Sequence, residues 1–326
     1  MTRNHNFKRR VRERAAKTGE SYTSALRHLS RSPEGGSELV SRGIRLAVAQ
    51  STGRLDPANL AELRAAGEEA RGLMRQAQRA GARLLHFSEG SMSSPDKRIV
   101  SSLGPESVGP ADWNRCNWDV LREEIAAVCR AARDLGLWVV IGSPHRLTAR
   151  RPHSSLYVIS DQGELVTRYD ERMLSNTKLS FMYTPGSVPV TFEIDGMRFG
   201  CTLGMEAHYP ELFIEYERLN VDCVLFSTTG GGPFAAEIAG HAASNSFWTS
   251  FAVHAQHSTE APAGIVAPDG TWVARATPGV VPTLAVAEIS TDPSNPARPW
   301  RRTARQGLYQ DHLAVDDQRS AERTVL

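Results

Sequence analysis

The stretch Arg198-Phe-Gly-Cys-Thr-Leu-Gly-Met-Glu-Ala-His-Tyr-Pro-Glu-Leu-Phe213 decides how this chain folds. Its apolar residues 199–203 predict a buried strand, and a helix should follow at once. Pro210 suits the first helical turn, where a missing N–H costs nothing, and Glu211 suits the positive end of the helix. The tight elbow between strand and helix is of the kind that lifts one side chain into a pocket in several hydrolase folds. In this chain the elbow begins with a glycine, Gly204.

Charge is spread unevenly over the 326 residues, whose formal net charge is +2. Residues 1–31 hold nine Lys or Arg and two acidic residues, whereas the rest of the chain holds 29 basic and 34 acidic residues. Residues 1–40 are therefore interpreted as a basic helical arm with a flexible linker, which packs on the body or on a partner subunit. Nucleic-acid binding through residues 3–31 is the alternative. The body should span residues 41–290, and an irregular Arg- and Pro-rich tail should span residues 291–326.

The cysteines and the hydropathy of the chain bear on its compartment. Four cysteines, without the spacing of a metal site, favour free thiols in a reducing compartment. The sequence contains no apolar run of 18 residues and no signal-peptide core near its start. The sequence therefore predicts a soluble, cytoplasmic protein without membrane contact.

Helical and strand patterns alternate along the body, and hairpins interrupt them. The pattern favours a layered α/β fold with mixed sheets over an all-parallel arrangement. Helices are expected at 59–80, 118–135, from 212 onward and at 235–246. Strands are expected at 44–50, 83–88, 137–142, 156–159, 165–169, 188–194, 198–203, 223–227, 251–256, 264–267, 272–276 and 283–289.

The order and spacing of several short motifs resemble the nitrilase (carbon-nitrogen hydrolase) superfamily over residues 44–290. The motifs are residues 44–50, 81–89, 137–142, 157–163, 185–186, 200–212 and 264–270. The resemblance implies an αββα four-layer sandwich that forms homodimers. It also implies a Glu-Lys-Cys triad that acts on amides or nitriles, in which a thiolate attacks, a carboxylate transfers protons and a lysine stabilises the oxyanion.

Two of these three catalytic positions depart from the family pattern. The carboxylate falls on Glu89, which is present, whereas the lysine falls on Glu171 and the cysteine falls on Gly204. Cys201 is interpreted as a buried strand residue and not as a replacement nucleophile. Lys178, seven residues beyond Glu171, would reach the site only through a rearrangement of the loop. The predicted site therefore lacks both the thiol and the ammonium group.

Other residues near the elbow are candidates for ligand contacts. They are Met205, Glu206, His208, Arg172 and Gly230, the last in a Gly230-Gly-Gly232 loop where the family places a substrate-contacting loop. The histidines lack metal-ligand spacing, and the glycine triplet lacks the lysine of a phosphate-binding loop, so no metal or cofactor is predicted.

Three functions remain open at this point. The first is a pseudoenzyme that binds a small molecule or acts as a scaffold. The second is an enzyme in which Glu89 and Glu171 perform acid/base chemistry without a covalent intermediate, as a hydratase, cyclase or lyase would. The third is a DNA-associated ligand sensor that uses the basic arm.

Two further expectations concern partners. With a carboxylate in place of the family's ammonium, two nearby carboxylates should raise the pKa of one of them and favour cationic or hydrogen-bond-donating ligands. The helix after the elbow should contribute Leu212, Phe213, Tyr216 and Leu219 to a homodimer interface.

Overall fold

The computed structural model describes residues 11–12, 42–291 and 296–322 of the chain. The chain divides into two units, Met1–Val40 and Ser41–Leu326. The predicted helices of the basic arm lie almost entirely outside the described residues. We call the second unit the body.

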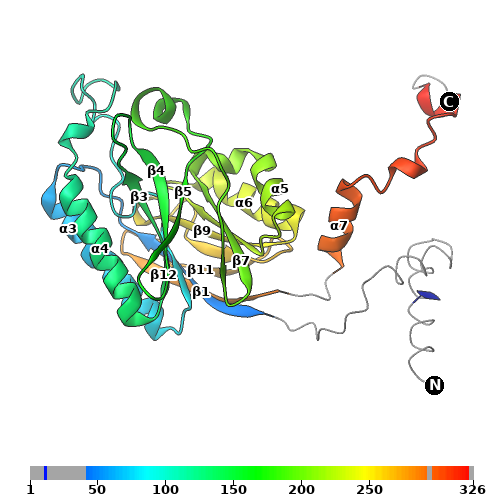
Figure 1. Ribbon diagram of the computed structural model, residues 1–326, viewed down its shortest axis with the longest axis horizontal. Coiled ribbons are helices and arrows are strands. Elements are labelled where there is room, and N and C mark those ends of the chain that lie inside the picture. Colours follow the sequence, from blue (N-terminus) through cyan, green and yellow to red (C-terminus); the bar gives the residue numbers. More distant parts are fainter. Residues whose placement is uncertain (1–10, 13–41, 292–295, 323–326) are drawn as a thin grey trace. The chain divides into compact units, whose positions relative to one another are not determined.

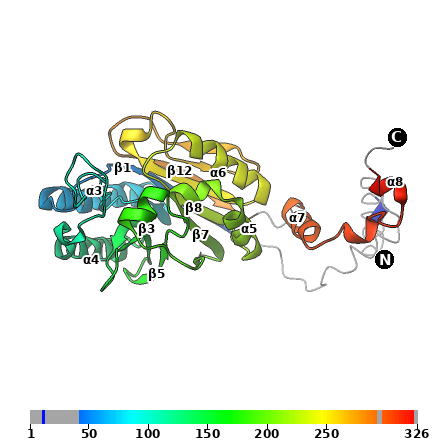
Figure 2. The same ribbon diagram turned by 90° about the horizontal axis from the view of Figure 1, so that it is seen from above.

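Two β-sheets form the middle of the body, between two helical layers (Figures 1 and 2). The strands run in the order β5-β4-β3-β2-β1-β9-β8-β7-β6, with β12 on β1 and the β10–β11 hairpin on β9. The two sheets meet where β1 pairs briefly with β9, at Gln50↔Val253 and Ser51↔His254. The first sheet contains β1 Gly43–Ser51, β2 Leu84–His86, β3 Trp138–His145, β4 His153–Ile159, β5 Leu165–Asp170 and β12 Thr283–Ser290. The second contains β6 Thr191–Ile194, β7 Met197–Leu203, β8 Cys223–Ser227, β9 Trp248–His254, β10 Gly264–Val266 and β11 Trp272–Arg275.

Helices cover the outer face of each sheet. The helices α3 (Leu60–Arg79) and α4 (Trp118–Leu135) pack on the first sheet, and α5 (Pro210–Arg218) and α6 (Gly232–Asn245) pack on the second (Figure 1). Strand β1 shows how the sequence builds these layers, because its alternate side chains point to opposite faces. Leu46 and Val48 enter the core between the sheets, whereas Ala47 and Ala49 face α3 and α4. This is the αββα four-layer sandwich that the sequence predicts.

The helix boundaries follow from local capping. The Asn59 side chain accepts hydrogen bonds from the backbone N–H groups of Ala61 and Glu62 and so begins α3. Asn117 caps α4 in the same way, and Gly136, in the left-handed conformation, ends it. Pro210 occupies the first position of α5.

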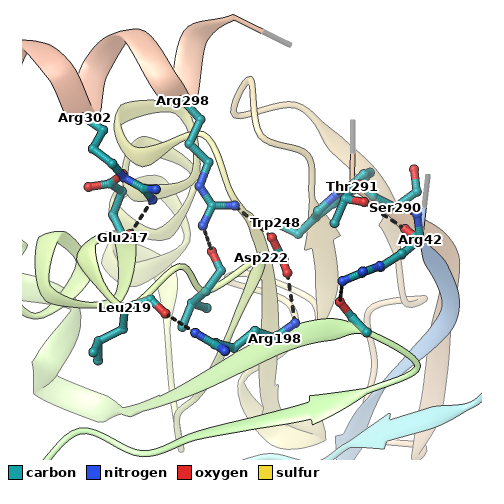
Figure 3. Close-up of polar contacts among 12 residues, drawn as sticks. Arg42, Arg198, Glu217, Leu219, Asp222, Trp248, Ser290, Thr291, Arg298 and Arg302 are labelled. Carbon is teal, nitrogen blue, oxygen red and sulfur yellow. Dashed lines mark hydrogen bonds and ion pairs between the residues drawn. The ribbon is translucent and has the colours of Figure 1, made fainter. Parts of the chain in front are cut away.

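The C-terminal tail is helical where the sequence predicts an irregular segment. Helix α7 (Ala297–Arg305) contacts the C-terminal ends of α5 and α6 through its arginines (Figure 3). Arg302 and Arg305 bind the carboxylate of Glu217, at 3.2 and 3.1 Å, and Arg298 binds Asp222 at 2.9 Å. Further contacts run from Arg298 to Val221 O, from Arg301 to Ala243 O and from Arg302 to Glu217 O. Cations are favourable at helix C-termini, where carbonyl groups lack partners, so this ionic docking stabilises an Arg-rich helix that has no apolar stripe. A short helix, α8 (Gln318–Ala321), follows.

The apolar face of α5 packs inward. Leu212, Phe213 and Tyr216 are at most 6% exposed and belong to the core of the body, and only Leu219 is exposed, at 37%. These three core side chains therefore cannot form the dimer interface assigned to them, and the homodimer stays a prediction. No helix in the described part of the chain is long and apolar enough to cross a membrane.

Candidate active site

Glu89 stands directly beyond the end of β2, on a segment with little freedom to move. The His254 side chain donates a hydrogen bond from Nε2 to the Glu89 backbone carbonyl, at 2.7 Å. Strand β3 approaches this segment so closely that only glycine fits beside it: a Cβ on Gly142 would lie 2.4 Å from Gly90 N and 2.5 Å from Ser88 O. The backbone that carries the Glu89 side chain is therefore held in place.

Glu171 follows the last residue of β5, and its side chain is completely buried. Its backbone is fixed on both sides, because Glu171 N donates to Ser154 O at 2.9 Å and Glu171 O accepts from Gly186 N at 2.8 Å. The family pattern predicts this residue in the site, and the structure brings it beside Glu89.

Lys178 joins the two carboxylates, although the loop that carries it was not expected to reach the site. Its Nζ contacts Glu89 Oε1 and lies 2.6 Å from Glu171 Oε2. The chain turns back between Glu171 and Lys178 and enters a single π-helical turn, Lys178–Met182, which directs the lysine inward. We call Glu89, Glu171 and Lys178 the ion cluster. An ammonium group is therefore present, and the prediction of a site without one was wrong.

Gly204 lies directly beneath the ion cluster. A Cβ at this position would be 3.2 Å from Glu89 Oε2, 3.3 Å from Glu171 Oε1 and 3.4 Å from Lys178 Nζ. The Gly204 backbone has φ +49°, a left-handed conformation that side chains other than glycine's adopt at a cost. The three charged groups thus surround the position where a side chain on the elbow would begin.

Burial controls the protonation of the ion cluster. Desolvation raises the pKa of Glu171 to about 8, because the opposing charge of Lys178 does not compensate for complete burial and for the charges of Glu89 and Glu206. Burial lowers the pKa of Lys178, but the charges of Glu171 and Glu89 outweigh it, so this pKa lies above its ordinary value. Glu171 Oε1 is buried and has no hydrogen-bond partner. Near neutral pH Lys178 therefore keeps its ammonium charge, and the raised pKa of Glu171 favours a proton on that carboxyl group.

Glu206, a predicted ligand contact, is a structural residue. Its buried carboxylate accepts hydrogen bonds from Tyr169 OH at 2.7 Å and from three backbone N–H groups, those of Leu203, Arg172 and Met173. Burial raises the pKa of Glu206, and these donors oppose the rise. Glu206 thereby ties the elbow to the segment that carries Glu171.

The other predicted contact residues point elsewhere or make structural contacts. The Arg172 side chain binds Glu215 Oε2 at 2.8 Å and Tyr169 OH at 3.3 Å. His208 is exposed and its Nδ1 lies 2.8 Å from Glu237 Oε1. Gly230 lies beside the ring of His257, and Met205 is half-buried next to the elbow.

Thiols and metal ligands do not complete the site. Cys201 is fully buried in the core, where desolvation raises the pKa of its thiol. Within residues 42–291 and 296–322, no group of three His, Cys, Asp or Glu side chains could hold a metal ion.

The sequence profile of the carbon-nitrogen hydrolase family matches residues 45–298, which is most of the chain. The chain belongs to this family. Its fold is also that of an amidase from Nesterenkonia sp. AN1, a nitrilase-superfamily protein. One crystal structure of that amidase has a TM-score of 0.62 and 19% identity, and the match covers 86% of this chain and 100% of the amidase. A cysteine-to-alanine mutant of the amidase in complex with butyramide has a TM-score of 0.62 and 20% identity, with coverage of 83% and 97%. No curated protein sequence matches significantly.

One feature of the sequence could have indicated the role of Lys178. Lysine is rare in this chain, occurring only at Lys8, Lys17, Lys97 and Lys178, and two of these lie in the arm. Of these lysines only Lys178 is close in sequence to Glu171. A buried carboxylate such as that of Glu171 is stabilised by a nearby cation. Its reach depends on the path of the loop, which the sequence does not fix.

Proposed function

We propose that this member of the carbon-nitrogen hydrolase family binds a small molecule non-covalently at the ion cluster and forms no thioester with amides. One observation carries the proposal: Gly204 lies beneath Glu89, Glu171 and Lys178, so the elbow brings no nucleophilic side chain to them. Cysteine-dependent hydrolysis of an amide or nitrile needs a thiolate at that point. The protein is, on this proposal, a pseudoenzyme that keeps the charged groups of the site without its nucleophile.

The ligand class follows from the groups left without partners. Lys178 Nζ has three N–H donors, and its two carboxylate contacts use two of them. Glu171 Oε1 has no hydrogen-bond partner among the described residues, and it lies 3.3 Å from the position that a Cβ on Gly204 would occupy. Glu89 Oε2 lies 3.2 Å from that position. A primary amide fits this set, because its carbonyl oxygen accepts from Lys178 and from protonated Glu171 while its N–H donates to Glu89.

Lys178 changes the expected charge of the ligand. The preference for cations rested on a site with two carboxylates and no ammonium group, and Lys178 removes that condition. We therefore propose a neutral amide ahead of a cationic ligand. The butyramide complex of the cysteine-to-alanine amidase mutant supports this choice, since a protein of this fold holds an amide after a cysteine is lost.

A series of nearly isosteric ligands tests the proposal. Calorimetric titration with butyramide, butyramidine and butyrate should show binding of butyramide, weaker binding of the amidine and none of the carboxylate. The variant Glu171→Met removes the donor at similar volume and should weaken butyramide binding by about tenfold, which corresponds to one buried hydrogen bond. The matched control Glu171→Gln keeps an N–H donor and should bind butyramide nearly as well as the native protein. Tighter binding of the amidine than of butyramide would restore the prediction of a cationic ligand. Binding of none of the three would refute the amide proposal.

A second measurement separates binding from catalysis. After incubation with fluoroacetamide, mass spectrometry should find no adduct on the native protein, and no ammonia should be released from butyramide. Sustained ammonia release would show that the site hydrolyses amides without a thiol and would overturn the pseudoenzyme proposal.

Acid/base chemistry without a covalent intermediate is the second candidate. It is favoured by the raised pKa of Glu171, which suits a general acid, and by the position of a second carboxyl group, that of Glu89, on the same lysine. Screening for hydration, cyclisation or elimination with the native protein and with Glu89→Gln tests this candidate. The third function, DNA association, concerns the arm and stays a prediction, which salt-dependent binding to duplex DNA would test.

A further inference from the structure

A groove of about 310 Å³ lies between the 3-10 turn Trp113–Arg115 and the segment 146–152. Two tryptophans and three arginines are among the residues that line it: Trp113, Trp118, Arg146, Arg150 and Arg151. We call it the arginine groove. Its volume is at the lower end of the range of small-molecule pockets, so it suits a small ligand.

The floor of the arginine groove is rigid. Trp113 Nε1 donates to Met182 O at 2.8 Å, and Trp118 Nε1 donates to Trp113 O at 3.0 Å. The Trp113 and Trp118 ring centroids are 5.8 Å apart, and the Trp113 ring also packs on Tyr183 at 5.3 Å. A ligand in the groove therefore meets aromatic rings that are already fixed.

The three arginines have no carboxylate partners. None of the ion pairs within the described part of the chain involves Arg146, Arg150 or Arg151. Arg146 lies over the Trp118 ring at 5.7 Å, and the backbone carbonyl of Arg151 is anchored by Thr184 Oγ1 at 2.7 Å. By contrast, the neighbouring Arg122 is paired with Asp119 at 2.6 Å.

The groove has a net positive charge. Asp112 is the one acidic residue among those that line it, and its side chain accepts from the backbone N–H of Asn114 at 3.1 Å. Three arginines line this hollow without an ion pair to any described residue, whereas the one carboxylate already caps a turn, so the groove has a surplus of N–H donors. Guanidinium groups bind carboxylates and phosphates in a bidentate manner, which makes such a surplus selective for anions.

We infer that the arginine groove binds the carboxylate or phosphate group of a small molecule, held by Arg146, Arg150 and Arg151. This site is distinct from the ion cluster. None of the three residues of the ion cluster, Glu89, Glu171 and Lys178, is among those that line the groove.

Tryptophan fluorescence gives a direct test with three probes: inorganic phosphate, benzoate and phenyl phosphate. We expect at least one probe to bind with a Kd below about 10 mM and the binding to weaken with added salt. Binding of benzoate but not phosphate identifies a carboxylate site, and the reverse identifies a phosphate site. If no probe binds at that concentration, the inference is overturned.

Substitutions then locate the site. Arg150→Ala and Arg151→Ala should each weaken binding of the positive probe by about tenfold, and the double variant by more. The matched control is Arg130→Ala, an exposed arginine without an ion pair, 12 residues and about 18 Å along α4 from Trp118. Equal weakening by the control would show a general charge effect and refute the site. Circular dichroism of each variant checks that the fold is kept.

Discussion

Two buried carboxylates, Glu206 within the elbow and Glu171 beside it, differ in how many hydrogen bonds they accept. Glu206 accepts hydrogen bonds from Tyr169 OH and three backbone amides, so both of its oxygens have partners. One oxygen of Glu171, Oε2, accepts a hydrogen bond from Lys178 Nζ, whereas the other, Oε1, has no hydrogen-bond partner among the described residues. A fully bonded buried carboxylate holds a fold together, whereas a half-bonded one has capacity left for a ligand. This contrast is the reason for our proposal that Glu206 has a structural role and Glu171 a role in ligand binding.

Replacing Glu206 should have the largest effect. Glu206→Ala leaves several buried N–H and O–H donors unpaired, so we expect it to lower the free energy of unfolding by roughly 3–5 kcal/mol. Glu206→Gln keeps the volume and one acceptor oxygen and should cost less. Urea denaturation measures both. A loss below about 1 kcal/mol for the alanine variant would show that Glu206 is not the structural carboxylate.

Removing Lys178 should have the second-largest effect on the free energy of unfolding. Lys178→Met leaves Glu89 and Glu171 facing each other, and because the lysine is 19% exposed we expect a loss of roughly 2–3 kcal/mol, below that of a fully buried pair. The loss should shrink at low pH, where both carboxyl groups are protonated and no longer repel each other. The control Lys97→Met changes an exposed lysine and should shift stability by less than about 0.5 kcal/mol. Equal effects of the two variants would contradict the ion cluster.

The raised pKa of Glu171 predicts a pH dependence of stability. Its folded pKa of about 8 lies above the ordinary value of 4.5, so the folded state binds this proton more tightly than the unfolded state. This contribution is complete below about pH 4.5 and is lost as the pH rises through about 8, with a change on the order of 1–2 kcal/mol for a residue that shares a lysine. Glu171→Gln should flatten the profile over that window. An unchanged slope in this variant would assign the titration to another group.

Substitution of Gly204 should have the smallest effect on stability and the sharpest effect on function. Gly204→Ala should cost about 1 kcal/mol, because φ is +49° and the new Cβ meets three charged atoms at 3.2–3.4 Å. Gly240→Ala is the matched control with the opposite sign: this α6 glycine has open space around it, and alanine should add roughly 0.5–1 kcal/mol. Thermal unfolding compares the two. Equal shifts of the unfolding temperature in the two variants would show that the close contacts around Gly204 do not affect stability.

The sequence predicts the fold more fully than the site. The helix at 118–135 and the strand at 223–227 match α4 and β8 residue for residue, because apolar periodicity and capping residues define them locally. The position of Lys178 could not be predicted in the same way, because it depends on the path of the loop between Glu171 and Lys178. The apolar stripe of α5 was assigned to a partner, whereas it packs in the core of its own body, because periodicity marks a buried face without saying what buries it. Helix α7 was missed because arginine contacts, not an apolar face, hold it.

The contacts around Gly204 also have a consequence for the redesign of this site. The side-chain atoms of Glu89, Glu171 and Lys178 lie 3.2–3.4 Å from the position that a Cβ on Gly204 would occupy. A cysteine introduced at this position would therefore meet three ionisable groups at close range. Gly204→Cys alone should not restore ammonia release from amides, whereas the combination with Glu171→Lys and Lys178→Glu returns lysine to the family position at unchanged net charge. Thiol chemistry at this elbow should therefore need several coordinated substitutions, because a single cysteine leaves the surrounding charges in their present places.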